Sequence, residues 1–242
     1  MKETLLGLKG LVILIYLLCL LFFPHLSDAD PLDNWHWRNP LPQGNSLNGV
    51  TYGNGRFVAV GNAGTILTSP DGVTWTQRDS GVAQNLNGVA YGNGLFVAVG
   101  ETILISPDSV TWTAPNPQTH YFLNAVAYGN GNFVAVGYGT VPLVSTDGAA
   151  WSEAAILGQL DYFVYLRCVA YGNGLFVAVG NACDFGSCEL ILTSSDGLVW
   201  TRIPSPAMAS LSVTYGNNMF VALGQGTIQT SLDGITWTRQ SL

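Results

Sequence analysis

The stretch LNGVTYGNGRFVAVGNAGTILTSPDGVTW, residues 47–75, decides the fold because the chain repeats it. Four further copies follow at 86–112, 123–151, 166–200 and 211–237, and together the copies account for nearly everything after Leu47. The tyrosines of successive copies stand 39, 37, 43 and 44 residues apart, at Tyr52, Tyr91, Tyr128, Tyr171 and Tyr215. Self-similarity at such a period predicts an array in which each copy is one supersecondary unit.

Each copy resolves into four short strand-like runs separated by turn signals. Asn-Gly within YGNG joins the first run to the second, and a type I′ hairpin favours this dipeptide because both central residues need positive φ. The second run, RFVAVG at 56–61 in the first copy, is apolar on both faces, as expected of a strand between neighbouring sheets. The third run ends in the turn signal Ser-x-Asp-Gly, and the fourth carries a tryptophan.

The turn before the fourth run recurs as SPDGVTW at 69–75, SPDSVTW at 106–112, STDGAAW at 145–151, SSDGLVW at 194–200 and SLDGITW at 231–237. These motifs resemble the Asp-box, or BNR, repeat of sialidase-like β-propellers, a superfamily that includes photosystem assembly factors. The usual box is Ser-x-Asp-x-Gly-x-Thr-Trp, whereas these copies lack one residue between Asp and Gly, and the second has Ser109 instead of Gly. The resemblance implies a structural role, and little about function, for Asp71, Trp75, Asp108, Trp112, Asp147, Trp151, Asp196, Trp200, Asp233 and Trp237.

The repeat length and the resemblance predict an all-β protein, a β-propeller of five four-stranded repeats. The repeats are expected at about 47–85, 86–122, 123–165, 166–210 and 211–242. WHWRNP at 35–40 looks like a further fourth strand, since Trp37 precedes Trp75 by 38 residues. Residues 30–46 are therefore expected to supply an extra N-terminal strand and a linker. An open arc, or a ring of six to seven blades completed by a partner chain, is the alternative.

The N-terminus is predicted to be an export signal. Lys2 and Lys9 precede an apolar run, and Ser27 and Ala29 form a small-x-small cleavage site, so residues 1–29 are expected to be removed. The mature protein would be secreted, periplasmic or otherwise extracellular, and the alternative is a membrane anchor formed by residues 5–23.

Three cysteines follow the predicted cleavage site. Cys183 and Cys188 bracket a short segment and are expected to form a disulfide in an exported protein. Cys168 stands where other repeats have Gly49, Gly88 and Ala125, so it is interpreted as a small buried residue.

The charged residues exclude several classes of function. After the predicted cleavage the chain has no lysine, and six arginines face thirteen carboxylates. A Walker phosphate loop and a Schiff-base lysine are thereby excluded, and the acidity argues against a nucleic-acid partner. Neither His36 nor His120 is close in sequence to a cysteine, so no metal site and no cofactor are predicted.

The candidate ligand-binding residues lie on connections that differ between repeats. In a four-stranded blade the YGNG and Asp-box turns share one face, and the other connections share the opposite face. Unequal loops on a rigid repeat usually carry recognition. Aromatic rings beside carboxylates suit a sugar or a peptide, although packing of the loops onto the ring explains them equally well. The residues of this kind are His120, Tyr121, Phe122, Asp161, Tyr162, Phe163, Tyr165, Asp184 and Phe185.

These features favour an exported, non-catalytic β-propeller that binds a protein or a carbohydrate through its variable loop face. A membrane-tethered assembly factor is one alternative. A sialidase needs three arginines from inner strands, and only Arg56 and Arg167 occupy early strands, so that activity is not expected. A glycosidase or lyase using two carboxylates stays open and depends on how far apart they lie; the carboxylates outside the repeat pattern are Glu101, Glu153, Asp161 and Asp184.

Overall fold

A computed structural model describes residues 44–115, 122–139, 141–157, 164–181, 189–203, 210–224 and 226–240, all within the unit Leu41–Leu242. These residues form strands, turns and bends and contain no helix, which confirms the all-β prediction. The predicted signal segment 1–29, the expected N-terminal strand at 35–40 and the predicted Cys183–Cys188 disulfide lie outside the described residues.

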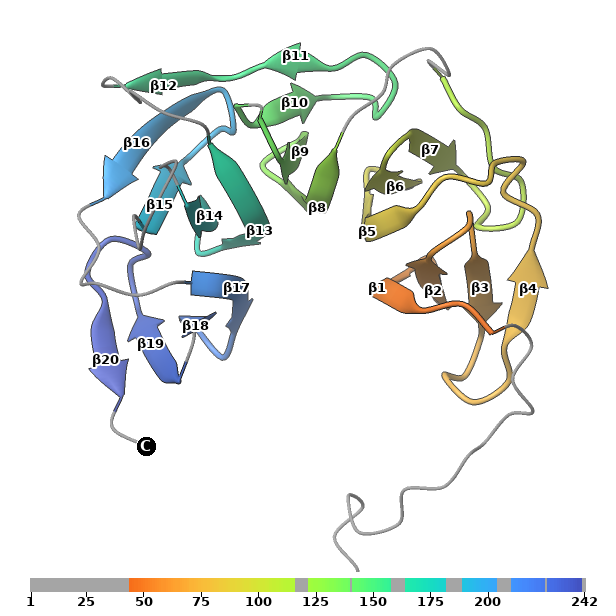
Figure 1. Cartoon of the computed structure of the whole chain (residues 1–242), viewed down its shortest axis with the longest axis horizontal. Coiled ribbons are helices and arrows are strands. Elements are labelled where there is room, and N and C mark those ends of the chain that lie inside the picture. The colour runs from red at the N-terminus through yellow and green to blue at the C-terminus, as the bar shows by residue number, and fades with distance from the viewer. Residues whose placement is uncertain are drawn as a thin grey trace, which may run out of the picture. The chain divides into compact units, whose positions relative to one another are not determined.

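Each repeat forms a sheet, here called a blade, and the blades follow one another in chain order (Figure 1). Blade 1 contains β1 (Leu47–Gly53), β2 (Arg56–Gly61), β3 (Ile66–Ser69) and β4 (Thr76–Arg78). Blade 2 contains β5 (Leu86–Gly92), β6 (Leu95–Gly100) and β7 (Ile103–Ser106). Blade 3 contains β8 (Leu123–Gly129), β9 (Asn132–Gly137), β10 (Leu143–Ser145) and β11 (Ser152–Glu153). Blade 4 contains β13 (Tyr165–Gly172), β14 (Leu175–Asn181), β15 (Glu189–Ser194) and β16 (Val199–Ile203). Blade 5 contains β17 (Ser210–Gly216), β18 (Met219–Gly224), β19 (Thr227–Ser231) and β20 (Thr238–Gln240).

Two blades depart from the expected four strands. In blade 2 the fourth run contributes only an antiparallel bridge between Ile105 and Thr113. In blade 4 a fifth strand, β12 (Ala155–Leu157), pairs in parallel with β16. The connection after blade 3, which the sequence suggested was a loop, therefore covers the outer edge of the next blade. Such cover removes an exposed strand edge that could pair with another chain.

The YGNG turns are hairpins with positive φ at both central residues. Asn54 and Gly55 have φ of 48° and 72°, and the other copies repeat these values closely. In blade 5 the pair is Asn217 and Asn218, with φ of 50° and 59°. Asparagine tolerates this left-handed region better than other residues with a side chain, so the turn survives the loss of its glycine.

The Ser-x-Asp turns before the outer strands, which we call Asp-box turns because of their resemblance to that motif, close through the aspartate side chain. Asp71 Oδ1 accepts hydrogen bonds from the Thr74 and Val73 amides, at 2.7 and 2.8 Å, and from Ser69 Oγ at 2.9 Å. Trp75 Nε1 donates to Gly72 O at 3.2 Å, which fixes the indole at the start of the outer strand. The amides of Thr74 and Val73, which favour the ionised carboxylate, lower the pKa of Asp71 to about 2. The other aspartates of the motif make the same contacts.

The hydrophobic core is divided among the blade interfaces. In the described part of the chain each buried cluster combines the forward face of one blade with the backward face of the next. Between blades 1 and 2, for example, Val58, Val60 and Ile66 pack against Leu86 and Phe96. Blades 2 and 3, 3 and 4, and 4 and 5 are joined in the same way. A blade is therefore stabilised mainly by its neighbours, as in other repeat proteins.

In blades 2 to 5, a tyrosine of the inner strand packs on the inner strand of the preceding blade. The ring of Tyr91 in blade 2 lies directly on Gly53 of blade 1, and Tyr128, Tyr171 and Tyr215 lie likewise on Gly92, Gly129 and Gly172. Each ring also packs against the phenylalanine of its own blade, as Tyr91 does on Phe96 at 4.5 Å between centroids. Any side chain on these glycines would collide with the ring, so the Tyr-Gly pair of the repeat is a requirement of blade stacking.

Asparagines form a second link between inner strands. Asn48 Nδ2 donates to Leu86 O at 2.9 Å, Asn87 Nδ2 to Leu123 O at 2.8 Å, and Asn124 Nδ2 to Leu166 O at 2.7 Å. We call this series the asparagine ladder. Arg167 takes the equivalent position in blade 4, where Cys168, a partly buried free thiol, donates to Val213 O at 3.3 Å instead. Cys168 thus lies between two blades, but it is only partly buried, whereas the sequence predicted a buried residue.

Candidate binding site

The two ends of the strands carry different features. At one end the YGNG turn of a blade meets the Asp-box turn of the next, since Asn132 Nδ2 donates to Asp196 O at 2.8 Å and Asn130 Nδ2 to Ser195 O at 3.2 Å. The prediction that these turns share a face is therefore correct. At the other end, where the inner strands begin, a pocket of about 420 Å³ opens between blades 2, 3 and 4.

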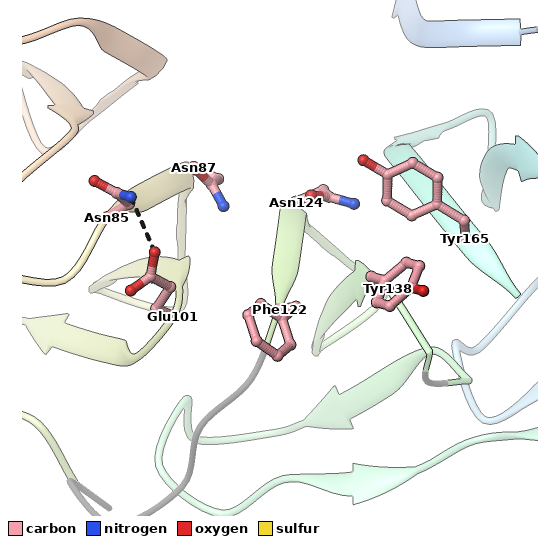
Figure 2. Close-up of a pocket in the computed structure, with 7 residues that line it drawn as sticks. All are labelled: Asn85, Asn87, Glu101, Phe122, Asn124, Tyr138 and Tyr165. Atoms are coloured by element: carbon pink, nitrogen blue, oxygen red, sulfur yellow. Dashed lines mark hydrogen bonds between the residues drawn. The ribbon is translucent and has the colours of Figure 1, made fainter.

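The pocket combines aromatic rings, amides and one carboxylate. Figure 2 shows the Asn85–Glu101 pair on one side and the rings of Tyr138 and Tyr165 on the other. Phe122 and Asn124 lie between them. The residues that line the pocket are Asn85, Asn87, Glu101, Phe122, Asn124, Tyr138 and Tyr165.

Backbone pairing holds the aromatic side of the pocket. Tyr138 follows β9 and bridges to Tyr165 at the start of β13, while its amide donates to Phe122 O at 2.8 Å. The two tyrosine rings meet edge to face, with centroids 5.4 Å apart and an interplanar angle of 78°. Tyr138 is 52% exposed and Phe122 64% exposed, so both rings offer apolar surface to a ligand although their backbone is fixed.

The guanidinium group of Arg167 lies over the ring of Tyr165, one of the two paired tyrosines. The Arg167 Cζ atom lies 4.4 Å from the centroid of the Tyr165 ring, and Arg167 Nε donates to Asn181 Oδ1 at 3.3 Å. A cation over the face of a tyrosine is attracted by the ring quadrupole, so Arg167 holds Tyr165 in its orientation. This contact exists only because blade 4 has arginine at the ladder position, where blades 1 to 3 have asparagine.

The acidic side of the pocket is fixed by Asn85. Its Nδ2 donates to Glu101 Oε1 at 2.9 Å, and its Oδ1 accepts from the Ala63 amide at 3.0 Å. The Glu101 amide in turn donates to Asn85 O at 3.0 Å. Glu101 is therefore held by both its backbone and its side chain, and no described residue donates a hydrogen bond to its second carboxylate oxygen.

The ladder asparagines Asn87 and Asn124 form the floor between the two sides. Each uses one N–H on the next inner strand. No donor from the described residues reaches either Oδ1. An amide with a spare oxygen and a spare N–H can pair with a peptide group in the same way that two backbone strands pair.

The structure brings together only part of the predicted site. Phe122 and Tyr165 line the pocket, and their role in binding stays a prediction. His120, Tyr121, Asp161, Tyr162, Phe163, Asp184 and Phe185 lie outside the described residues, so their role stays a prediction. Of the carboxylates considered for an enzyme, Glu101 lines the pocket, whereas Glu153 is exposed on the outer strand β11.

Sequence reasoning missed Asn85, Asn87, Asn124 and Tyr138. Asn87 and Asn124 belong to the repeat, and the argument from variable connections passed over them, although they line the pocket. Tyr138 was detectable, because it is an aromatic residue in a second-to-third connection where blades 1 and 2 have Asn62 and Glu101.

The described part of the chain contains neither a metal-binding cluster nor a membrane-spanning helix. No three or more His, Cys, Asp and Glu side chains there lie close enough together to hold a metal ion. No helix long and apolar enough to cross a membrane is found among those residues.

Blades with stacked inner strands, joined by hairpins and closed by outer tryptophan strands, define a β-propeller, here with a pocket at the end where the inner strands begin. Comparison with solved structures supports this fold. The chain is similar to a structure described as YCF48 bound to D1 peptide, with 18% identity, a TM-score of 0.61, and coverage of 82% of this chain and 67% of that one. YCF48 from Cyanidioschyzon merolae gives 16% identity and a TM-score of 0.61, covering 83% of this chain and 73% of that one.

A third similar structure is a chain of a protein complex. A chain of the nidogen/laminin complex gives 9% identity and a TM-score of 0.61, covering 80% of this chain and 79% of that one. No protein-family model matches the sequence, and no curated protein matches it. Identities this low establish the fold alone.

Proposed function

We propose that the chain is a non-catalytic β-propeller that binds an extended protein segment in the pocket between blades 2, 3 and 4. The observation that carries the proposal is the pairing of exposed aromatic rings, Phe122 and Tyr138, with the amides of Asn87 and Asn124. An aliphatic or aromatic side chain of the ligand would pack on the rings, and its peptide groups would pair with the amides.

The charge of the pocket indicates which segment fits. Glu101 is fixed by Asn85 and is the carboxylate that lines the pocket among the described residues. A basic side chain of the ligand would meet it there, and the acidic balance of the whole chain, with a net charge of −7, would steer a basic segment toward the protein. The proposed ligand is therefore a segment with an apolar residue beside a lysine or arginine.

The glycosidase or lyase alternative requires two carboxylates at a common site. Glu101 lines the pocket, whereas Asp161 and Asp184 lie outside the described residues. The support for peptide binding comes from a similar fold. One of the similar solved structures is described with a bound peptide. A carbohydrate also fits rings and amides, so the experiment must separate the two ligand classes.

The test begins with the purified protein on an array of synthetic peptides and on a glycan array. The selected peptides are then titrated against Phe122→Ala, Tyr138→Ala and a control, Val110→Ala, whose side chain is 40% exposed on the Asp-box turn at the other end of blade 2. We expect either aromatic variant to weaken binding tenfold or more, as truncated aromatic anchors usually do, and the control to change nothing. Binding to glycans alone, or equal affinity of all variants, would overturn the proposal.

We also propose that the protein is exported, with residues 1–29 removed. The charged, apolar and small-residue segments of the N-terminus support this. N-terminal sequencing of the protein recovered from its host tests it. A mature chain that begins at Asp30 is expected, and an intact Met1 terminus in a membrane fraction would favour the anchor instead.

A further inference from the structure

The first and the last blade each have one face that no described blade covers. Elsewhere in the series, faces of these two kinds meet and form the interfaces between neighbouring blades. In the described residues, the forward face of one blade always meets the backward face of the next, with a tyrosine ring on a glycine at the inner edge. Among the described residues, no sheet lies behind blade 1 and none lies in front of blade 5. The corresponding side chains show this directly.

The backward face of blade 1 is uncovered. Val50 is 64% exposed, whereas its equivalents in the next blades, Val89, Val126, Val169 and Val213, are buried. Leu47 is 49% exposed, whereas Leu86, Leu123 and Leu166 are completely buried. Tyr52, the ring that should lie on a glycine of a preceding blade, is 59% exposed.

The forward face of blade 5 is uncovered as well. A Cβ added to Gly53, Gly92, Gly129 or Gly172 would strike the tyrosine of the next blade, but a Cβ at Gly216 would meet nothing within 4 Å. Leu223 is 47% exposed, whereas Val60, Val99, Val136 and Val179 at the same position are fully buried. At Gly216, blade 5 therefore has space for a tyrosine ring of another blade, beside the exposed apolar side chain of Leu223. We call this position the tyrosine seat.

We propose that these faces join two copies of this chain head to tail, with the backward face of blade 1 in one copy seated on the forward face of blade 5 in the other. The two faces match because they are the halves of one repeated interface. Tyr52 would lie on Gly216, and Leu47 and Val50 would cover Leu223. Contiguous exposed apolar surface of this kind marks an interaction site.

A second copy is the occupant that the sequence favours. The seat at Gly216 takes a strand with tyrosine before glycine, and in the described chain every such strand except β1 already lies on the preceding blade. Residues 1–43 contain no Tyr-Gly pair. Within the given sequence, β1 is the strand that has this Tyr-Gly pair and an exposed face, so the occupant we propose is β1 of a second copy.

The contact is heterologous, because different faces of the two copies meet. A pair joined in this way still has one free face of each kind, so it can close on itself through the second junction or add further copies. This property distinguishes the proposed contact from a symmetric dimer and provides the test.

The test uses two variants, each with one face blocked. Gly216→Ala places a methyl group in the tyrosine seat, and Tyr52→Ser removes the ring. Ile235→Ala, an exposed side chain on the Asp-box turn of blade 5, is the control. Sedimentation velocity from about 1 to 100 µM measures the mass of each protein, and thermal unfolding at the lowest concentration confirms that each is folded.

We expect the unchanged protein and Ile235→Ala to form dimers or larger assemblies, and each blocked variant alone to stay monomeric with an unchanged unfolding temperature. Mixed one to one, the blocked variants should form a dimer and nothing larger, because the intact blade 1 face of Gly216→Ala fits the intact blade 5 face of Tyr52→Ser. A monomeric unchanged protein would overturn the proposal, whether the faces are then bare, closed on each other or covered by residues 1–43. A mixture that stays monomeric would overturn it as well.

Discussion

Placing a methyl group on Gly53 should separate blades 1 and 2. A Cβ built on Gly53 stands 2.5 Å from Tyr91 Cβ and closer still to the ring carbons, where about 3.4 Å is ordinary contact. The ring cannot retreat freely because it packs on Phe96 with centroids 4.5 Å apart. Overpacking in a well-packed core costs typically 1–3 kcal/mol. Since a whole ring must move here, we expect Gly53→Ala to cost about 3 kcal/mol, roughly 6–12 °C in unfolding temperature for a domain of this size.

The control for this experiment is the same substitution where the seat is empty. Gly216→Ala occupies the equivalent position in blade 5 and meets nothing within 4 Å, so its cost in a monomer should stay within about 0.5 kcal/mol. Calorimetry at a concentration where the protein is monomeric measures both variants. The double variant Gly53→Ala with Tyr91→Ala should be less destabilised than the sum of its single changes by about 2 kcal/mol, because the collision is gone. Equal unfolding temperatures for Gly53→Ala and Gly216→Ala would refute the role given to the Tyr-Gly contact.

Three further changes follow from the turns and the pocket. Ser109 is completely buried with φ of 64°, and its Oγ lacks a hydrogen-bond partner in the described residues. Ser109→Gly should therefore raise the free energy of unfolding by about 1 kcal/mol, measured by denaturant unfolding. An unchanged or lower midpoint would show that the position is not strained. The pKa values of Asp108 and Asp233 are lowered to about 2 by backbone amides of their own turns, so the stability they provide is present above the ordinary pKa of 3.8 and is lost as pH falls toward 2. The unfolding temperature should therefore drop between pH 4 and 2, and less steeply in Asp233→Asn; parallel curves would contradict this. Arg167→Asn should extend the asparagine ladder to blade 5 and remove the cation over Tyr165. Ligand affinity should therefore fall, while the unfolding temperature stays the same or rises. A folded variant with full affinity would show that Arg167 does not contribute to the site.

The architecture could be predicted because its signals are local. Asn-Gly determines its hairpin within four residues, and Asp71 closes its turn with the amides two and three residues further on. Such contacts recur wherever the motif recurs, so one copy explains the rest. The reduced fourth run of blade 2 and the added strand β12 were not predictable in this way, because they depend on how a connection of particular length reaches a neighbouring edge.

The pocket was harder to predict for a physical reason. Its residues come from three blades and meet because the inner strands begin side by side, which no local pattern encodes. The prediction favoured residues that vary between repeats, so of the residues that line the pocket it named Phe122 and Tyr165 but not Asn87 and Asn124. A repeated side chain can serve the scaffold with one polar atom and a ligand with another, so repetition alone does not exclude a residue from a site.

The asparagine ladder links the scaffold to the proposed function. From blade 1 to blade 4 the ladder ties each inner strand to the next, and its side chains at blades 2 and 3 also line the pocket. At blade 4 the ladder ends, because Arg167 turns its guanidinium onto Tyr165 and Asn181. Blades 4 and 5 are joined instead by apolar packing and by the weaker hydrogen bond that the Cys168 thiol donates to Val213 O. The substitution thus removes a stabilising contact from the scaffold at the place where it fixes an aromatic wall of the pocket. The same side chain therefore gives up a ladder contact and orders a ring of the pocket, which agrees with the binding role proposed above.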